Sequence, residues 1–217
     1  MKTAIVLGAT GLTGKLLVNQ LIADDSYSVI KLFTRRKSDF SSSKIVEFVG
    51  NVIELEDFKA EFTADVVFCC IGTTAAKTKD RAIYKQIDFG IPVKAATLCK
   101  ENGIDTFVVV SAMGADAMSA IFYNKTKGDM EQAVLNCGLK SCYIMRPSLI
   151  KGNREDKRLG EIIASGVMLL ANFFFVGKWR KYRAIEAKTI ALAMLNVAKN
   201  GYSENIIESD KIERLGT

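Results

Sequence analysis

A glycine-rich turn lies close to the amino terminus of this chain and limits the folds that the chain can adopt. Gly8, Gly11 and Gly14 follow the apolar run 3–7 and lead directly into the amphipathic run 12–23. In such a unit the first glycine allows a tight turn, the second lets the backbone approach a pyrophosphate, and the third lets the helix pack closely on the strand. The helix N-terminus adds free N–H groups and a positive dipole. Plain turns also contain spaced glycines, but this position between strand and helix favours a dinucleotide site.

Short apolar runs recur along the rest of the chain, separated by longer amphipathic stretches. They are continuous rather than alternating, which is typical of parallel strands that helices bury on both faces. The predicted strands are 3–7, 29–33, 45–49, 65–71, 106–110 and 142–145. The clearest predicted helices are 12–23, 83–102, 123–137 and 189–200, with Gly103 and Gly138 as C-terminal stops. This alternation predicts an α/β fold of the Rossmann type, with a doubly wound, mostly parallel sheet.

No proline-rich, serine-rich or charged stretch divides the 217 residues, so we expect a single domain in which residues 147–217 form a smaller substrate-side region. The chain is 49% hydrophobic and 25% charged, which is typical of a soluble globular protein. The five cysteines lie in apolar segments without CxxC spacing, and we interpret them as reduced core residues. Because the chain has no histidine, we expect no metal site and exclude Ser-His and Cys-His nucleophiles.

The amino-terminal apolar run is too short for a signal peptide, so a cytoplasmic location is predicted. The net charge of +6 would suit an anionic ligand such as a nucleotide as well as it would suit nucleic acid. The basic residues are scattered, however, and no aromatic-interleaved motif accompanies them. We therefore expect no nucleic-acid partner.

The second predicted strand ends in a basic run that contains Arg35 and Arg36. NAD-specific sites place an acidic residue at about this point, where it meets the ribose 2′-hydroxyl. Two guanidinium groups would instead bind a 2′-phosphate. Surface charge runs are usually solvated loops, which is the alternative interpretation. The position after the second strand favours NADP(H) as the cofactor over NAD(H).

A candidate proton-handling group follows the strand 106–110. Tyr123 and Lys127 are four residues apart in a predicted helix, a spacing that places the phenol and the ammonium on one face. A nearby cation favours the phenolate, so such a tyrosine could protonate a carbonyl oxygen. Ser111 stands at the carboxyl end of the strand and could hydrogen-bond the same oxygen. A half-buried tyrosine beside a solvated lysine is the alternative, because this spacing is common by chance.

Together these residues resemble the short-chain dehydrogenase/reductase superfamily, specifically its atypical branch. Within that branch the chain is similar to the HIV Tat-interacting protein family of NADPH-binding, oxidoreductase-like proteins and its bacterial homologues. The similarity covers nearly the whole length of the chain. The matching positions are the three glycines, the fourth-strand segment 65–72, Ser111, Tyr123, Lys127, the run Arg146, Pro147 and Ser148, the motif 159–161 and the closing residues 208–217.

The resemblance implies NADPH as the cofactor, together with a set of residues around it. On the phosphate and adenosine side it implies Thr10, Leu12, Thr13, Arg35, Arg36, Asn51, Cys70, Ile71 and Gly72. On the nicotinamide side it implies Tyr123 as acid/base, Lys127 on the ribose hydroxyls, and Pro147, Ser148 and Leu149 beside the ring. Two positions depart from the family: Asn51 stands where many relatives have Asp, and Asp88 where many have Asn. The amide of Asn51 can still bond adenine, whereas Asp88 would alter any proton relay.

Residues 161–177 form a nearly uncharged stretch that a basic run, 178–183, follows. The stretch is slightly short for a membrane-spanning helix, so no transmembrane segment is predicted. We interpret it as a core helix or a flap over the substrate cleft. The alternative is a contact patch for a membrane surface or for a dimer, which leaves a homodimer or a protein partner open.

Three functions are compatible with these patterns. The first is an NADPH-dependent reductase of a small carbonyl-type substrate. The second is a non-catalytic NADP(H)-sensing module that contacts another protein. The third, a nucleotide-sugar epimerase, rests on the fold alone and is disfavoured because little chain follows the sixth predicted strand.

Overall fold

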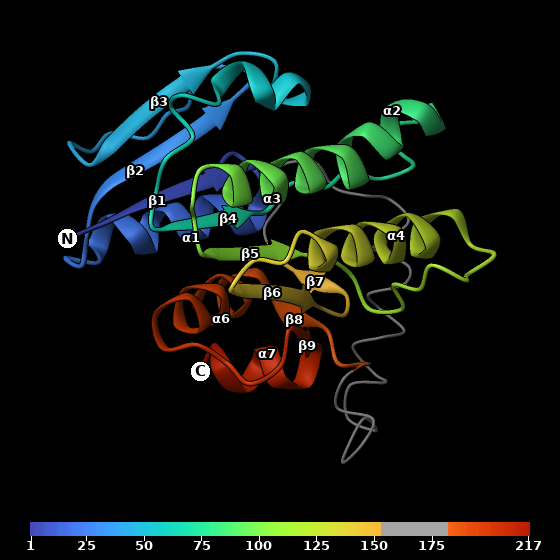
Figure 1. Ribbon diagram of the computed structural model, residues 1–217. Coiled ribbons are helices and arrows are strands. Elements are labelled where there is room, and N and C mark those ends of the chain that lie inside the picture. Colours follow the sequence, from blue (N-terminus) through green and yellow to red (C-terminus); the bar gives the residue numbers. More distant parts are fainter. Residues whose placement is uncertain (153–181) are drawn as a thin grey trace.

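The computed structural model describes residues 1–152 and 182–217 of the chain. Within them, seven parallel strands form one sheet with helices on both faces (Figure 1). The strands are β1 (Lys2–Leu7), β2 (Tyr27–Thr34), β3 (Ile45–Val49), β4 (Val66–Cys69), β5 (Thr106–Val110), β6 (Ser141–Arg146) and β9 (Ile206–Glu208). The predicted doubly wound Rossmann fold is therefore confirmed, and all six predicted strands are present.

The strand order reverses its direction at one point of the sheet. The order is β3-β2-β1-β4-β5-β6-β9, so the chain runs outward from β1 in one direction and then crosses to β4 on its other side. Leu7 at the end of β1 pairs with Phe33 of β2 and with Cys69 of β4. Open α/β sheets bind ligands at the carboxyl ends of strands where the winding reverses. Here that point lies between β1 and β4.

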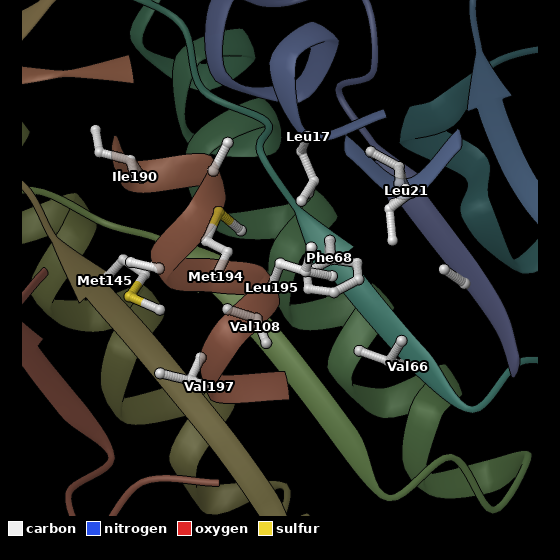
Figure 2. Close-up of a cluster of buried hydrophobic side chains, with 14 of the residues drawn as sticks. Leu17, Leu21, Val66, Phe68, Val108, Met145, Ile190, Met194, Leu195 and Val197 are labelled. Carbon is white, nitrogen blue, oxygen red and sulfur yellow. The ribbon is translucent and has the colours of Figure 1, made fainter. Parts of the chain in front are cut away.

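Helices cover the two faces because alternate residues of each buried strand point to opposite sides. One face packs against α1 (Leu12–Ala23), α6 (Ala187–Asn200) and α7 (Ser209–Leu215). The other packs against the 3₁₀ helix η1 (Val52–Phe58), α3 (Ile91–Glu101) and α4 (Phe122–Asn136). Figure 2 shows the first of these cores, where side chains of α1 and α6 meet those of the central strands. Its labelled members are Leu17, Leu21, Val66, Phe68, Val108, Met145, Ile190, Met194, Leu195 and Val197.

The predicted helix 83–102 is divided into three pieces. A short helix, α2 (Arg81–Lys85), continues through a π-helical turn, η2 (Gln86–Gly90), into α3. Pro92 explains the irregularity, because proline has no N–H to donate and its ring clashes with the carbonyl of residue 88 in a regular helix. The turn buries Asp88, which is 1% exposed. π-Helical turns are often found at functional sites.

The carboxyl-terminal part contains elements that the sequence did not reveal. β9 adds a seventh strand by pairing with β6, and α7 follows it. Two short strands, β7 (Ile150–Lys151) and β8 (Ile185–Glu186), pair in parallel on either side of the undescribed residues. The motif 159–161 and the apolar stretch 161–177 lie outside the described residues. In the described part, no helix has the length and apolarity needed to cross a membrane.

Candidate cofactor and catalytic site

The glycine turn leaves no room for side chains at two of its three glycines. Gly8 has a positive φ of 79°, and a Cβ there would come within 2.8 Å of the Cys70 carbonyl carbon. A Cβ at Gly14 would overlap the Gly8 carbonyl oxygen. At Gly11 the nearest atom would be that same oxygen, at 3.3 Å. The glycines therefore bring the start of α1 against both β1 and the segment that follows β4.

Among the described residues, the N-cap position of α1 provides no side-chain hydrogen bond to the backbone donors of the first turn. Gly11 is the N-cap residue, and it makes no side-chain hydrogen bond with the amides that follow it. The first amides of a helix have no acceptor within the helix, so they can bind an anion. Thr10 and Gly11 are exposed at this point, whereas Thr13 is buried. The turn is a cradle that fits the pyrophosphate of a dinucleotide.

The basic residues predicted to bind the 2′-phosphate lie at the carboxyl end of β2. Arg35 and Arg36 follow β2 directly and are exposed. The parallel register of β1 and β2 puts this strand end beside the glycine turn. In the part of the chain that the structure describes, neither guanidinium forms an ion pair or a side-chain hydrogen bond. Both cations are thus available to an incoming anion.

The residues assigned to the adenosine side occupy different surroundings. The Asn51 side chain is exposed, and its oxygen accepts a hydrogen bond from the Ile53 N–H at 3.2 Å, which caps η1. Cys70 and Ile71 follow β4, where the Cys70 N–H donates to the Leu7 carbonyl at 2.9 Å. This bond extends the pairing of β1 and β4 beyond the last residue of β4. Gly72 is exposed there.

Lys127 and Asp88 form a buried ion pair beside Gly72. Their charged atoms are 2.9 Å apart, with 5% and 1% of the two side chains exposed. A Cβ on Gly72 would lie 3.5 Å from the Asp88 carboxylate and 3.8 Å from the Lys127 ammonium. Burial by itself lowers the pKa of Lys127, but Asp88 and Tyr123 outweigh it and raise that pKa above the usual value. The lysine is therefore held as a cation.

Tyr123 lies at the start of α4, one helical turn before Lys127, and its side chain is 40% exposed. The neighbouring Phe122 fixes this end of the helix, because its ring contacts Tyr84 of α2 with centroids 5.4 Å apart. Arg81 also lies over the Phe122 ring, at 5.2 Å. α2 thus anchors the helix end that presents the phenol to solvent.

Ser111 is buried, and its hydroxyl belongs to a charged network. The hydroxyl donates to Glu131 at 2.5 Å, and Glu131 is bound through both oxygens by the guanidinium of Arg146. Arg146 reaches Glu208 as well, at 3.2 Å. The one proton of the serine hydroxyl is thus directed at Glu131. The sequence did not reveal this network, although Glu131 lies one turn beyond Lys127 on the same helical face.

The segment predicted to border the nicotinamide is held by its backbone. The Pro147 carbonyl accepts from the Met113 N–H at 2.9 Å, and the Leu149 carbonyl accepts from the Ile185 N–H at 2.9 Å. The Ser148 N–H donates to the Ser209 hydroxyl oxygen, and the Ser148 hydroxyl donates to the Arg183 carbonyl. These bonds fix residues 147–149 between the end of β5 and the strand β8.

Contacts join part of the predicted set into one site. The glycine turn touches Cys70, the same segment continues to Gly72, and Gly72 borders Lys127 and Asp88. Asp88 completes this cluster by accepting the Thr73 N–H at 2.7 Å. Asp88 was noted in the sequence only as a departure from a family pattern. Its contact with Lys127 depends on the π-helical turn, which no spacing rule predicts.

A family model and several known proteins are similar to this chain in sequence. A family model described as NAD(P)H-binding matches residues 8–163. Protein FMP52, mitochondrial, of Candida albicans is 31% identical over 99% of this chain and 94% of that protein. Protein HTATIP2 of Rattus norvegicus is 29% identical over 99% of this chain and 89% of that protein. The word mitochondrial belongs to the first relative, and a cytoplasmic location for this chain stays a prediction.

Solved structures with the same fold have much lower sequence identity. A short-chain dehydrogenase/reductase superfamily protein of Agrobacterium tumefaciens with bound NAD is 13% identical, with a TM-score of 0.72 over 94% of this chain and 76% of that chain. A UDP-glucose 4-epimerase of Thermotoga maritima with UDP-glucose is 14% identical, with a TM-score of 0.70 over 99% of this chain and 81% of that chain. At such identity these likenesses bear on the fold alone.

Proposed function

Because this chain belongs to the NAD(P)H-binding family, we propose that it binds NADPH and reduces a small carbonyl-type substrate. One observation carries the proposal. The buried cation Lys127 lies beside Gly72. Gly72 belongs to the segment 70–72, whose first residue, Cys70, contacts the glycine turn. Tyr123 lies one helical turn before Lys127. In this proposal the phosphate cradle and the candidate proton donor lie at the same edge of the sheet.

In this proposal the phosphates lie at the amino end of α1, held by the amides after Gly11 and by Thr10, Leu12 and Thr13. Arg35 and Arg36 bind the 2′-phosphate, and Asn51 meets the adenine. Cys70, Ile71 and Gly72 border the adenosine ribose. Lys127 holds the nicotinamide ribose, and residues 147–149 border the ring. Residues 147–217 then form the substrate side of the site.

NADPH supplies a hydride to the carbonyl carbon, and the protein supplies the proton. Tyr123 is the proposed donor, since its phenol is partly exposed and Lys127 lies on the same face of α4. Ser111 was expected to bond the substrate oxygen as well. Because its hydroxyl proton is directed at Glu131, we propose that Ser111 does not donate to the substrate oxygen and that Tyr123 is the donor.

The hydrogen bond from Ser111 to Glu131 also favours a second candidate, a module that binds NADP(H) without turnover. With the Ser111 proton directed at Glu131, a substrate oxygen would have only one hydroxyl donor of the expected two, namely Tyr123. The bound cofactor would stabilise a conformation of this chain that a protein partner recognises and binds. The two candidates share the cofactor site and differ in whether Tyr123 is needed.

The test is calorimetric titration of the purified chain with NADPH and NADH, followed by a panel of aldehydes and ketones at saturating NADPH. A reductase consumes NADPH with at least one carbonyl compound, and Tyr123→Phe lowers that rate by at least about 100-fold while NADPH still binds. Tight NADPH binding with no consumption across the panel supports the sensor instead. Failure to bind either nucleotide would overturn both candidates.

A further inference from the structure

Glu47, in the middle of β3, reaches the loop that carries the basic residues. One of its carboxylate oxygens accepts two hydrogen bonds, from the Thr34 hydroxyl at 2.9 Å and from the Ser38 N–H at 2.9 Å. Thr34 and Ser38 immediately flank the basic tripeptide 35–37. A single carboxylate oxygen therefore closes this loop at both ends.

The strand register explains why this acid reaches the loop. β2 and β3 pair in parallel, with Glu47 opposite Leu32 and Val49 opposite Thr34. The Gly50 N–H continues the pairing by donating to the Thr34 carbonyl at 2.9 Å. Glu47 thus lies on a strand fixed along its length, and it anchors a loop that lies just past the end of the neighbouring strand.

The carboxylate orders the basic loop without neutralising it. Its bonds go to a hydroxyl and to an amide, and no ion pair joins it to Arg35 or Arg36 in the described part of the chain. Both guanidinium groups therefore keep their charge free for a ligand. The Ser38 hydroxyl oxygen is also buried without a protein partner among the described residues, as is common where a ligand or water completes a site.

We propose that Glu47 is a positioning residue for cofactor selection, which holds the loop 34–38 so that Arg35 and Arg36 face the 2′-phosphate of NADPH. The inference rests on the proposed NADPH site but not on catalysis. An ordered loop binds more tightly than a mobile one, because less conformational entropy is lost when the ligand arrives. Without the two hydrogen bonds to Glu47, the tripeptide 35–37 keeps its charge, but its side chains are no longer held in one orientation.

The direction in which Glu47→Ala changes NADPH affinity distinguishes a positioning role from a purely electrostatic one. A carboxylate near a phosphate repels it, so a purely electrostatic Glu47 would make Glu47→Ala bind NADPH more tightly. The positioning role predicts the opposite. Glu47→Gln provides the matched variant, because its amide oxygen can accept both hydrogen bonds without the charge.

The experiment is calorimetric titration of wild type, Glu47→Ala and Glu47→Gln with NADPH, NADH, adenosine 2′,5′-bisphosphate and AMP. The last two probes isolate the adenosine end of the site. We expect Glu47→Ala to weaken NADPH and the bisphosphate by about ten-fold or more, with NADH and AMP changed less than about two-fold. Glu47→Gln should bind NADPH at least as tightly as wild type. Val46→Ala, on the exposed side of β3, is the control and should match wild type.

Two results would overturn the inference. One is a folded Glu47→Ala protein that keeps the wild-type preference for NADPH over NADH. The other is a Glu47→Gln protein that loses the preference as fully as Glu47→Ala. If Glu47→Ala does not fold, Thr34→Val decides, because it removes one of the two donors from a buried site at constant volume. Thr34→Val should weaken NADPH binding several-fold, and an unchanged affinity would then count against the anchor. A wild-type protein that binds no NADPH contradicts the proposed function itself.

Discussion

The ammonium of Lys127 lies 2.9 Å from the carboxylate of Asp88, and both side chains are almost entirely removed from solvent. The other oxygen of Asp88 accepts the Thr73 N–H, so one carboxylate connects α4 to the segment that follows β4. The cation that the helical spacing pairs with Tyr123 therefore has its main partner on a different element. The pair therefore balances the charge of Lys127 and joins separate elements of the candidate site.

Asp88→Asn should strongly destabilise the protein. The asparagine leaves the Lys127 charge buried without a counter-ion, and breaking such a pair costs roughly 3–5 kcal/mol. The measurement is urea unfolding, followed by circular dichroism. Asp105→Asn is a matched control, because its partner Lys140 is 3.5 Å away on an exposed surface, and its loss should stay below about 1 kcal/mol. Equal losses in the two variants would contradict the importance of burial.

The contribution of this pair should depend on pH only in the alkaline range. The pKa of Lys127 is raised in the folded protein by Asp88 and Tyr123 against the effect of burial. A raised pKa stabilises fully below the unfolded value of about 10.5 and loses its effect as pH rises through the folded value. Wild-type stability should therefore keep this contribution from about pH 7 to 9 and lose it above about 10.5, as measured by urea unfolding across that range. A contribution that is already lost near pH 8 would contradict this cause.

Gly14→Ala should damage the fold and the cofactor site together. The added methyl group overlaps the Gly8 carbonyl oxygen, so α1 must move away from the turn. Overpacking of this kind costs about 1–3 kcal/mol, and we expect NADPH binding to weaken by at least about ten-fold. Gly90→Ala serves as the control, because its φ is −60° and the nearest atom is 3.9 Å away. If Gly14→Ala unfolds at the same urea concentration as Gly90→Ala, the close packing is not needed.

The sheet could be predicted from the sequence because its strands are buried on both faces and therefore appear as unbroken apolar runs. β9 was missed because it has only three residues, and its neighbour β6 supplies the pairing that makes it a strand. The C-terminal stops at Gly103 and Gly138 were predicted correctly, since both glycines have positive φ, at 70° and 64°. The conformational preference of a single residue was thus enough to predict these two helix ends.

The site was less predictable because its key partners come from separate elements. Helical spacing placed Tyr123 and Lys127 on one face, but it said nothing of Asp88, which reaches Lys127 from the π-helical turn. The hydrogen bond between Ser111 and Glu131 likewise joins a strand end to a distant helix. Glu47 is invisible for the same reason, since only the register of β2 and β3 brings it to Thr34. Such contacts follow from tertiary packing and not from the order of residues.

The buried cysteines should be unreactive in the folded protein. Burial raises the pKa of Cys69 to about 11 and that of Cys142 to about 12, so both remain thiols near neutral pH. With the disulfide reagent DTNB at pH 8, we expect Cys69, Cys99 and Cys142 to react at least about 100-fold more slowly than in urea. Cys137 is only partly buried and provides the internal comparison. Rapid reaction of Cys69 in the native protein would show that the edge of β4 opens readily.

Ser111→Ala and Glu131→Ala should differ in severity because they remove different parts of one network. Without the Ser111 hydroxyl, Glu131 keeps its hydrogen bonds to Arg146, so the loss should be about 1.5–3 kcal/mol, with NADPH affinity within about two-fold of wild type. Among the described residues, Glu131→Ala leaves Arg146 with Glu208 alone, so it should cost more than Ser111→Ala. Urea unfolding of both variants, with NADPH titration of Ser111→Ala, measures these effects. If Ser111→Ala abolished NADPH binding, the serine would contact the cofactor directly and its bond to Glu131 would be incidental.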